Sequence, residues 1–182
     1  MRLFIAIPLA SDAIDALERL SQSLRSVGDG MLWSSPESWH ITLQFLGETS
    51  EEQYGCVVER LKDIQAPAFR VRLAGTGFFE RAGVFFAGVN VSAEMAELER
   101  RVVAATSQCG FASEDRPYHP HVTLARVKGG NRRHALRGLK GLVKGEAEFS
   151  SFIATEFLLF EAFLDPNGAR YEIRERFPLG EG

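Results

Sequence analysis

The sequence is poor in cysteine: Cys56 and Cys109 are the only two among 182 residues. Disulfide-stabilised secreted domains and structural zinc sites need more cysteines, at characteristic spacings. Both residues fall in segments that we predict to be helical. We therefore expect two unpaired thiols that pack in the core. A reducing compartment, and hence a cytoplasmic location, fits this expectation.

Long hydrophobic runs are also missing. A helix that spans a membrane needs about 20 consecutive apolar residues, and no segment here is that long. The opening residues, MRLFIAIPLA, begin like a secretory signal with Arg2 and an apolar run. Pro8 interrupts that run, and a charged amphipathic segment follows at once, which is not typical of a signal peptide. We predict neither membrane insertion nor secretion.

The chain has no excess of positive charge. It carries 21 Lys and Arg against 24 Asp and Glu, for a formal net charge of −3. A protein that wraps a long nucleic acid needs many cationic contacts to phosphate, so this balance argues against that class. Recognition of the end of a nucleic acid remains open. The length, with no linker or low-complexity segment, predicts a single domain over residues 1–182.

What is present is a mixture of strand and helix patterns without the strict alternation of a doubly wound sheet. Capping signals mark some helices, such as Ser50 with Gln53 and the lone Ser92. The chain ends in a predicted hairpin whose turn is residues 165–168. We predict an α+β fold with mostly antiparallel sheets. Strands are expected at 2–7, 39–47, 69–79, 83–91, 118–127, 152–164 and 169–177, and helices at 11–27, 50–62, 92–109 and 132–143.

Histidine is scarce, with four residues, yet two of them begin the same pattern. The sequence reads His-Ile-Thr-Leu at residues 40–43 and His-Val-Thr-Leu at residues 121–124. Independent draws at ordinary abundances give such a repeat with a chance of roughly one in ten thousand. The spacing, 121 − 40 = 81 residues, is close to half the chain. We interpret the pair as an internal duplication that forms two similar lobes facing one cleft.

Strand geometry assigns the polar residues of each copy to one face. Side chains alternate along a strand, so His40 and Thr42 project together, as do His121 and Thr123. The same alternation groups Gln44 with His40, either on a wet surface or in contact with a substrate. It assigns Phe45 to the core. It also turns Arg126 away from His121, unless a bulge or strand end brings the guanidinium round to bind phosphate.

Two imidazoles and two hydroxyls facing one volume suit in-line displacement at a phosphodiester. Imidazole has a pKa near 6.5, so one neutral ring and one protonated ring coexist near neutral pH. The neutral ring takes a proton from water while the other gives a proton to the leaving oxygen. Threonine hydroxyls donate hydrogen bonds to the non-bridging oxygens. None of these steps requires a metal.

Other residues are candidates for the same site. His119 and His121 have a spacing found in metal sites, but no further ligands stand at persuasive spacings. His134 is expected at the surface. Stacking of a terminal base is one role open to Tyr118 and to four phenylalanines that are otherwise expected in the core: Phe78, Phe79, Phe85 and Phe86. A basic segment is expected either as a solvated helix face or as a guide for an RNA backbone: Arg132, Arg133, Arg137 and Lys140.

These motifs resemble the two-histidine (2H) phosphoesterase superfamily, and most of all its bacterial RNA 2′,3′-cyclic phosphodiesterases, also called 2′-5′ RNA ligases. The resemblance rests on both His-x-Thr-Leu motifs and on the segments RLFIAIPL, FLGE, PHVTLAR and LFEAFLDPNGARYEIRERFPL. It implies a bilobal fold with helices outside two sheets that face a central cleft. It also implies hydrolysis of a terminal RNA 2′,3′-cyclic phosphate to a 2′-phosphomonoester, with weak ligase activity in some members.

The resemblance also orders the residues. It makes His40 the proton donor and His121 the proton acceptor, and it lets Thr42 and Thr123 hold the phosphate, with Arg126 beside them. It implies no cofactor and no metal, and we expect a monomer that acts on RNA 3′ ends. The sequence leaves three alternatives open. These are a small cyclic nucleotide or ADP-ribose cyclic phosphate as substrate, a non-catalytic protein that binds RNA ends, and metal-dependent hydrolysis.

Overall fold

The structure is a computed structural model that describes residues 1–25, 30–113, 116–129, 135, 137–140, 143, 148–165 and 168–180. Its helices are α1 (Ser11–Arg25), the short 3-10 helix η1 (Pro36–Ser38), α2 (Glu51–Lys62) and α3 (Ala93–Ser107). Its strands are β1 (Arg2–Pro8), β2 (Met31–Trp33), β3 (His40–Glu48), β4 (Phe69–Phe79), β5 (Val84–Asn90), β6 (His121–Val127), β7 (Glu148–Ala154), β8 (Glu156–Asp165) and β9 (Gly168–Pro178).

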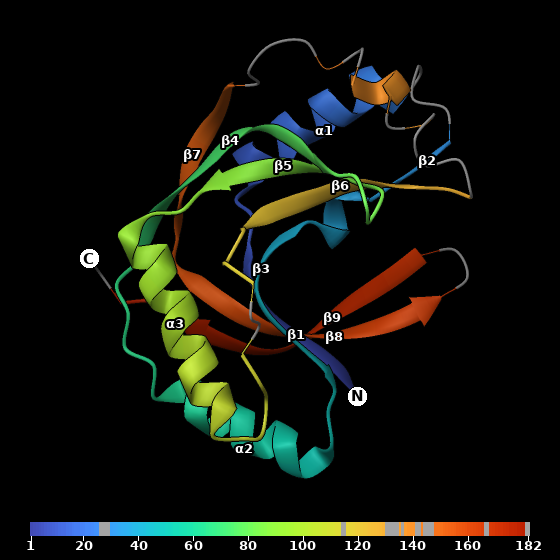
Figure 1. Ribbon diagram of the computed structural model, residues 1–182. Helices are drawn as coiled ribbons and strands as arrows, with labels where there is room; N and C mark the ends of the chain where they lie inside the picture. Colours follow the sequence, from blue (N-terminus) through green and yellow to red (C-terminus); the bar gives the residue numbers. More distant parts are fainter. Residues whose placement is uncertain are drawn as a thin grey trace.

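The strands form two antiparallel sheets, which confirms the predicted α+β class. One sheet has the order β3-β1-β8-β9 and the other has the order β2-β6-β5-β4-β7. Figure 1 shows strands from the two ends of the chain, blue and red, side by side in the first sheet. Green and yellow strands from the middle of the chain dominate the second. Each sheet therefore combines segments that are distant in sequence.

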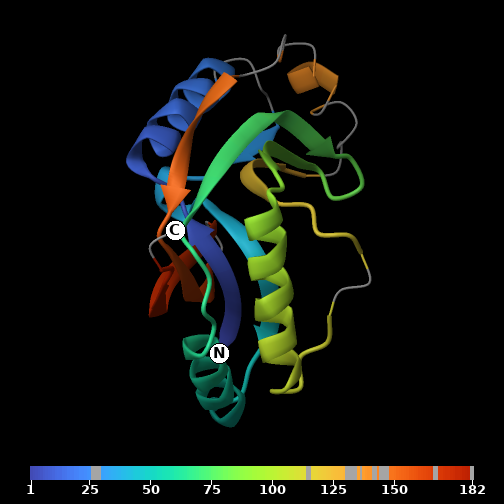
Figure 2. The ribbon, with the colours of Figure 1, turned by 90° about the vertical axis from the view of Figure 1, so that its left-hand side faces the viewer.

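Strand β1 is central because it is apolar on both faces. All five residues from Leu3 to Ile7 are buried. Leu3, Ile5 and Ile7 belong to the hydrophobic core, which also takes side chains from all three α-helices. Burying one such side chain is worth about 1.5–3 kcal/mol, so this strand anchors the first sheet. The helices lie outside the sheets (Figure 2), as the sequence predicted.

The predicted helix starts are largely confirmed. Ser50 and Gln53 form the full capping box, in which the Ser50 hydroxyl accepts from the Gln53 backbone N–H and the Gln53 side chain accepts from the Ser50 N–H. The Ser92 hydroxyl accepts a hydrogen bond from the Met95 backbone N–H at the start of α3. Each cap satisfies a backbone donor that the helix leaves unpaired, which is worth about 1 kcal/mol.

The end of the chain differs from the prediction in one respect. The segment expected as one strand over residues 152–164 is two strands, separated at Thr155. The first, β7, pairs with β4, whereas β8 pairs with β1 and β9, so the chain changes sheets here. The predicted hairpin is confirmed, because β8 and β9 pair up to Asp165 and Gly168. Strand β2 was not predicted, and half of the expected helix 132–143 lies outside the described residues.

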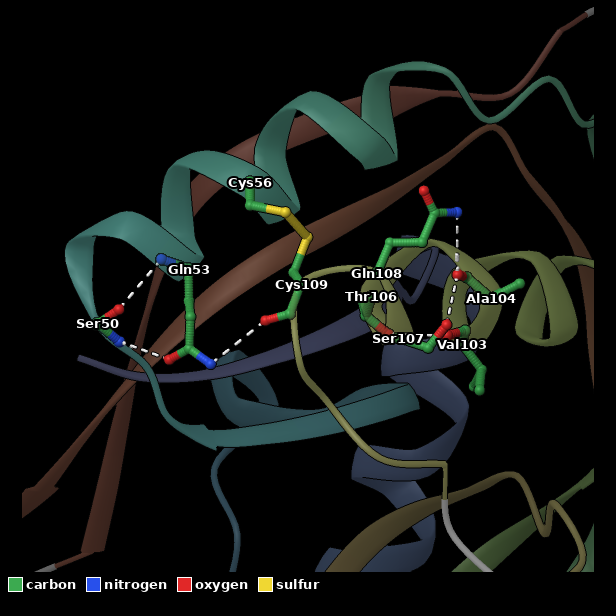
Figure 3. Close-up of a disulfide and its surroundings, with 9 residues drawn as sticks. All are labelled: Ser50, Gln53, Cys56, Val103, Ala104, Thr106, Ser107, Gln108 and Cys109. Carbon is green, nitrogen blue, oxygen red and sulfur yellow. Dashed lines mark hydrogen bonds between the residues drawn. A yellow bond between two sulfur atoms is a disulfide. The ribbon is translucent and has the colours of Figure 1, made fainter.

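The cysteine prediction is wrong. Cys56 of α2 and Cys109, just after α3, form a disulfide with Cα atoms 5.8 Å apart. Figure 3 shows the bond beside the capping box, and the Gln53 side-chain amide also donates to the Cys109 carbonyl at 3.4 Å. The sequence could not reveal the pairing, because 53 residues separate the two cysteines and only the packing of α2 on α3 brings them together. The inference of a reducing compartment from unpaired thiols therefore no longer holds.

Candidate active site

The first histidine motif lies on β3, an edge strand that pairs with β1. Ile41 and Leu43 are buried in the core, while His40 and Thr42 are half-buried on the opposite face. This alternation is the one that the sequence predicted for these four residues. It holds because the aliphatic side chains gain free energy by leaving water, which fixes the face on which the polar pair stands.

The alternation breaks immediately after Leu43. The pairing of Ile5 with Gln44 and of Ala6 with Thr42 leaves Leu43 as an extra residue, which is a β-bulge. Gln44 is therefore buried on the core side, where its side-chain oxygen accepts a hydrogen bond from the Thr106 hydroxyl of α3 at 2.7 Å. Both interpretations offered for Gln44, wet surface and substrate contact, are wrong. Phe45, expected in the core, is instead 61% exposed.

The second motif lies on β6 and contains the same bulge at the same place. Phe85 pairs with Ala125 and Phe86 with Thr123, so Leu124 is the extra residue. Leu124 and Ala125 are both buried, and Arg126 is exposed. The bulge thus turns Arg126 to the face that carries His121 and Thr123. Strict alternation pointed the other way, and the exception that the sequence allowed for Arg126 is the one observed.

The two motifs converge. Strands β3 and β6 contact each other although they belong to different sheets, and they lie near the centre of the molecule in Figures 1 and 2. The hydroxyl of Tyr118, just before the second motif, donates to the Thr42 carbonyl of the first at 3.1 Å. Charge on His121 also acts on His40. We call this set of His40, Thr42, His121, Thr123 and Arg126 the two-histidine site.

Both histidine rings are held in the same way. The Nδ1 atom of His40 lies 2.8 Å from the Ser38 carbonyl, and that of His121 lies 2.8 Å from the His119 carbonyl. A carbonyl oxygen can only accept, so Nδ1 carries the proton in both neutral rings. Each ring therefore leaves Nε2 as the nitrogen that gains or loses a proton.

Burial shifts both imidazoles toward the neutral form. It lowers the pKa of His40 to about 4, with charge on His121 adding to the effect and the bond to Ser38 opposing it. Burial also lowers the pKa of His121; the hydrogen bond to the His119 carbonyl opposes this shift, while charge on the His119 ring and on Arg126 adds to it. The cost of desolvating a cation explains the direction in both cases. Without a bound anion, both rings are therefore neutral at pH 7.

Aromatic rings surround His40 on the first sheet. The Phe4 ring lies 4.6 Å from the His40 ring, and Phe160 stacks on Phe4 at 5.0 Å. Tyr171 of β9 meets His40 edge-on at 5.2 Å, and burial raises the pKa of its hydroxyl while the charge of Arg126 lowers it. Tyr171 therefore contacts His40 of the first motif and lies within the electrostatic reach of Arg126 of the second. Phe45 is the fourth aromatic residue of this group, and its ring lies 6.0 Å from the Phe4 ring.

A second pair of rings supports His121. Phe79 and Phe86 stack at 4.3 Å, and their centroids lie 4.9 and 5.3 Å from the His121 ring. Phe86 lies over Gly77, where a Cβ atom would come within 2.4 Å of the ring. Among the other rings considered for stacking a base, Phe85 is fully buried and Phe78 packs against it. Tyr118 is tied to Thr42, as described above.

Of the remaining predicted residues, some lie near the two-histidine site, some lie elsewhere, and some are outside the described residues. His119 is exposed, with its ring 6.2 Å from that of His121. Within the described part of the chain, no group of three His, Cys, Asp or Glu is placed to hold a metal ion. Lys140 pairs with Glu80 and lies over the Phe78 ring, and Arg137 is exposed. Arg132, Arg133 and His134 lie outside the described residues.

Sequence reasoning missed the ring cluster of the first sheet: Phe4, Phe45, Phe160 and Tyr171. One signal was available. Arg126 stands five residues after His121, and Phe45 stands five residues after His40. A bulge that brings one into the site must, in a duplicated motif, bring its counterpart as well. The rings that β1, β8 and β9 contribute to this cluster had no such signal, because their positions depend on the order of the strands in the sheet.

A surface hollow of about 300 Å³ between α2 and α3 is a weaker candidate. Its lining includes Arg60, Arg100 and Arg101, which resembles an anion site. Arg100 and Arg101 are, however, both paired with Glu97 at 2.7 Å, which offsets their charge. The hollow contains neither histidine. We therefore place the candidate chemistry at the two-histidine site.

Comparison with known proteins agrees with this geometry. A family model described as the 2′-5′ RNA ligase superfamily matches residues 11–149. A protein of Aeropyrum pernix named RNA 2′,3′-cyclic phosphodiesterase is 34% identical over 168 residues, covering 87% of this chain and 92% of that protein. One of Geobacillus stearothermophilus with the same name is 33% identical over 181 residues and 97% of this chain. This chain spans about half of that relative's length, 56%.

Solved structures show the same fold. A protein of Thermus thermophilus superposes with a TM-score of 0.80 at 31% identity, with full coverage of both chains. LigT of E. coli superposes with a TM-score of 0.82 at 24% identity, covering 99% of this chain and 98% of its own. No helix in the described residues is long and apolar enough to cross a membrane.

Proposed function

Because the chain belongs to the 2′-5′ RNA ligase superfamily of two-histidine phosphoesterases, we propose that it opens terminal 2′,3′-cyclic phosphates of RNA. Water is added, the bond between phosphorus and the 3′ oxygen breaks, and a 2′-phosphomonoester with a free 3′-hydroxyl remains. Relatives that match most of this chain carry the name RNA 2′,3′-cyclic phosphodiesterase, which supports the substrate class.

The observation that carries the proposal is the repeated anchoring of the two imidazoles. Both Nδ1 atoms lie 2.8 Å from a carbonyl two residues earlier, on two strands that contact each other. The anchors leave two equivalent Nε2 atoms for proton transfer in one volume. Displacement at phosphorus needs two such groups, one on each side of the reacting atom.

In the proposed reaction, Nε2 of His121 removes a proton from the attacking water, and the water oxygen bonds to phosphorus. Nε2–H of His40 gives its proton to the departing 3′ oxygen. The reaction leaves His121 protonated and His40 neutral, and proton exchange with solvent restores the starting forms. Each transfer contributes roughly 10²- to 10⁴-fold to the rate.

Thr42 and Thr123 stand two residues after the histidines on the same face of each strand, and both are half-buried. We assign their hydroxyls to the non-bridging phosphate oxygens, where negative charge grows in the transition state. The Arg126 guanidinium, turned to this face by the bulge, supplies fixed positive charge beside them.

The substrate itself supplies the charge that the free site lacks. Both imidazoles are neutral at pH 7 because burial lowers the pKa of each. A cyclic phosphate is an anion, and an anion placed between the rings favours their protonated forms. Binding therefore recruits the proton that His40 donates. A 5′-hydroxyl in place of water would give a 2′-5′ linkage by the same transfers, which is the weak ligase reaction we also propose.

The test is product identification. The purified protein is incubated in EDTA with an oligonucleotide ending in a 2′,3′-cyclic phosphate, and the product monoester is assigned by mass and by nuclear magnetic resonance of phosphorus. We expect a 2′-phosphate, formed at the same rate with and without EDTA. A 3′-phosphate would overturn the assignment of the leaving oxygen. Loss of turnover in EDTA would replace this mechanism with a metal-dependent one, and tight binding without turnover would indicate a binding protein.

A further inference from the structure

The chain contains three tyrosines, and two of their hydroxyls are held in hydrogen bonds within the protein. Tyr54 donates to Glu175 at 3.0 Å, and Tyr118 donates to the Thr42 carbonyl at 3.1 Å. The hydroxyl of Tyr171 has no hydrogen-bond partner in the part of the chain that the structure describes, although its side chain is half-buried. A polar group that leaves water costs free energy unless a new partner replaces the water. The Tyr171 hydroxyl is therefore available to a ligand.

Tyr171 lies on the face of the first sheet that carries His40. Ile173 pairs with Phe160, and Tyr171 stands two residues before Ile173, so Tyr171 and Phe160 project from the same face. Strands β1 and β8 separate β9 from β3, yet the Tyr171 ring meets the His40 ring edge-on at 5.2 Å. Phe4, on β1, contacts both rings, 4.6 Å from that of His40 and 5.0 Å from that of Tyr171. The tyrosine therefore reaches across the sheet to the candidate proton donor.

Tyr171 is also close to the second motif, because the charge of Arg126 acts on its hydroxyl. Burial raises the pKa of that hydroxyl above its ordinary value, while Arg126 lowers it, so the hydroxyl is protonated at pH 7 and can donate a hydrogen bond. A phosphate held by both the His40 imidazole and the Arg126 guanidinium lies between two groups that are each near Tyr171. Its non-bridging oxygens, which carry the negative charge, are then the acceptors that the hydroxyl lacks in the free protein.

We propose that Tyr171 is a further catalytic residue of the two-histidine site, and that its hydroxyl donates a hydrogen bond to one non-bridging oxygen of the scissile phosphate. This inference rests on the function proposed above. Negative charge on that oxygen grows in the transition state, so the hydrogen bond strengthens during the reaction and raises kcat. Tyr171 transfers no proton in this role, and no covalent bond changes at its side chain.

The test measures binding first, because binding does not require turnover. The dissociation constants of adenosine 2′-phosphate and of adenosine, which lacks the phosphate, are compared by nuclear magnetic resonance titration. Tyr171→Phe keeps the ring and removes the hydroxyl, so it should weaken the phosphate-bearing ligand about 10-fold and leave adenosine unchanged. Tyr54→Phe is the matched control, since that hydroxyl bonds to Glu175 between α2 and β9. A phosphate preference that Tyr171→Phe leaves intact would overturn the proposal.

Turnover then separates a contact to oxygen from a purely structural role of the ring. The two diastereomers of adenosine 2′,3′-cyclic phosphorothioate each replace a different non-bridging oxygen with sulfur, which is a weak hydrogen-bond acceptor. Tyr171→Phe should lower kcat about 10-fold for the all-oxygen substrate and for one diastereomer, and it should have little effect on the diastereomer whose sulfur faces Tyr171. Tyr171→Leu, which also removes the ring from His40, should lower kcat further for all three.

The outcomes distinguish this proposal from the function on which it rests. An equal loss of kcat for all three substrates in Tyr171→Phe would contradict the contact to oxygen and leave Tyr171 as a support for the His40 ring. Full turnover in Tyr171→Phe would overturn the proposal while the wild-type reaction stands. Phosphate binding that depends on the Tyr171 hydroxyl, in a protein without turnover, would leave the contact standing and overturn the proposed reaction.

Discussion

The strands that carry His40 and His121 are alike where they would hold phosphorus and different just beyond it. Both have the order His, aliphatic, Thr, Leu, both place a bulge at that Leu, and both anchor Nδ1 to the carbonyl two residues earlier. Past the bulge, one copy presents Phe45 and the other presents Arg126. In the proposed reaction the repeated motif supplies a matched pair of proton-transfer groups, while the residues just past the bulge differ in chemistry.

The copies also differ in their surroundings. His40 lies among rings from β1, β8 and β9, and burial lowers its pKa to about 4. His121 lies beside Phe79, Phe86 and the exposed His119, and burial lowers its pKa as well. Both environments favour the neutral imidazole, so they do not by themselves distinguish the acid from the base, and in the proposed reaction the bound anion brings the proton to His40.

Removing either imidazole is the largest expected effect. His40→Gln and His121→Gln should each reduce kcat at least about 1,000-fold, because each deletes one of two required proton transfers. The measurement is hydrolysis of a cyclic-phosphate oligonucleotide, with circular dichroism to confirm folding. His119→Gln is the matched control, since its ring is exposed and it has no proton-transfer role in this mechanism. Near-wild-type turnover in either motif variant would remove that histidine from the reaction.

Loss of the disulfide is the next largest expected effect. It joins the helix that follows the first motif to the segment that leads into the second, across 53 residues. Closing a loop of that length in the unfolded chain stabilises the fold by about 4 kcal/mol. Cys56→Ser should lower the free energy of unfolding in urea by about that amount. Wild type in reductant should match the variant. Two titratable thiols in the untreated protein would contradict the pairing.

Stability should also fall at acidic pH, through His40 more than through His121. The pKa of His40 is about 4 in the folded chain, below its ordinary value of 6.5. The unfolded chain therefore binds a proton between these values while the folded chain does not, so stability is lost as pH falls from 6.5 to 4. The loss is on the order of 3 kcal/mol. Urea unfolding across this range should show a shallower fall in His40→Gln than in wild type, and an unchanged slope would contradict the burial of His40.

Replacing Arg126 should have a smaller effect on catalysis than replacing either motif histidine. Arg126→Leu should lower kcat/KM about 30-fold, because a charge-assisted contact to phosphate is worth about 2 kcal/mol. Arg126→Lys should restore part of it. The loss should be the same for substrates with and without a base, because the proposed contact is to phosphate. A loss confined to base-bearing substrates would contradict a contact between Arg126 and phosphate.

Much of this site could be predicted from the sequence because the informative residues are local. The placement of His40, Thr42, His121 and Thr123 follows from strand alternation and from the aliphatic residues between them. The bulges could not be predicted, since an extra residue changes no local pattern and shows only in the register with β1 and β5. The extra residue at Leu43 explains the wrong assignments of both Gln44 and Phe45. The disulfide and the rings from β8 and β9 depend on strand order and helix packing, which hydrophobic periodicity does not reveal.

The central claim is that one imidazole serves the leaving oxygen and the other serves water. The most direct measurement replaces the 3′ oxygen of the cyclic phosphate with sulfur, a leaving atom that needs no proton, and compares His40→Gln with His121→Gln. We predict that sulfur restores most of the rate lost in His40→Gln and little of that lost in His121→Gln. Rescue of His121→Gln instead would reverse the two roles, and rescue of neither would contradict an acid–base pair at this site.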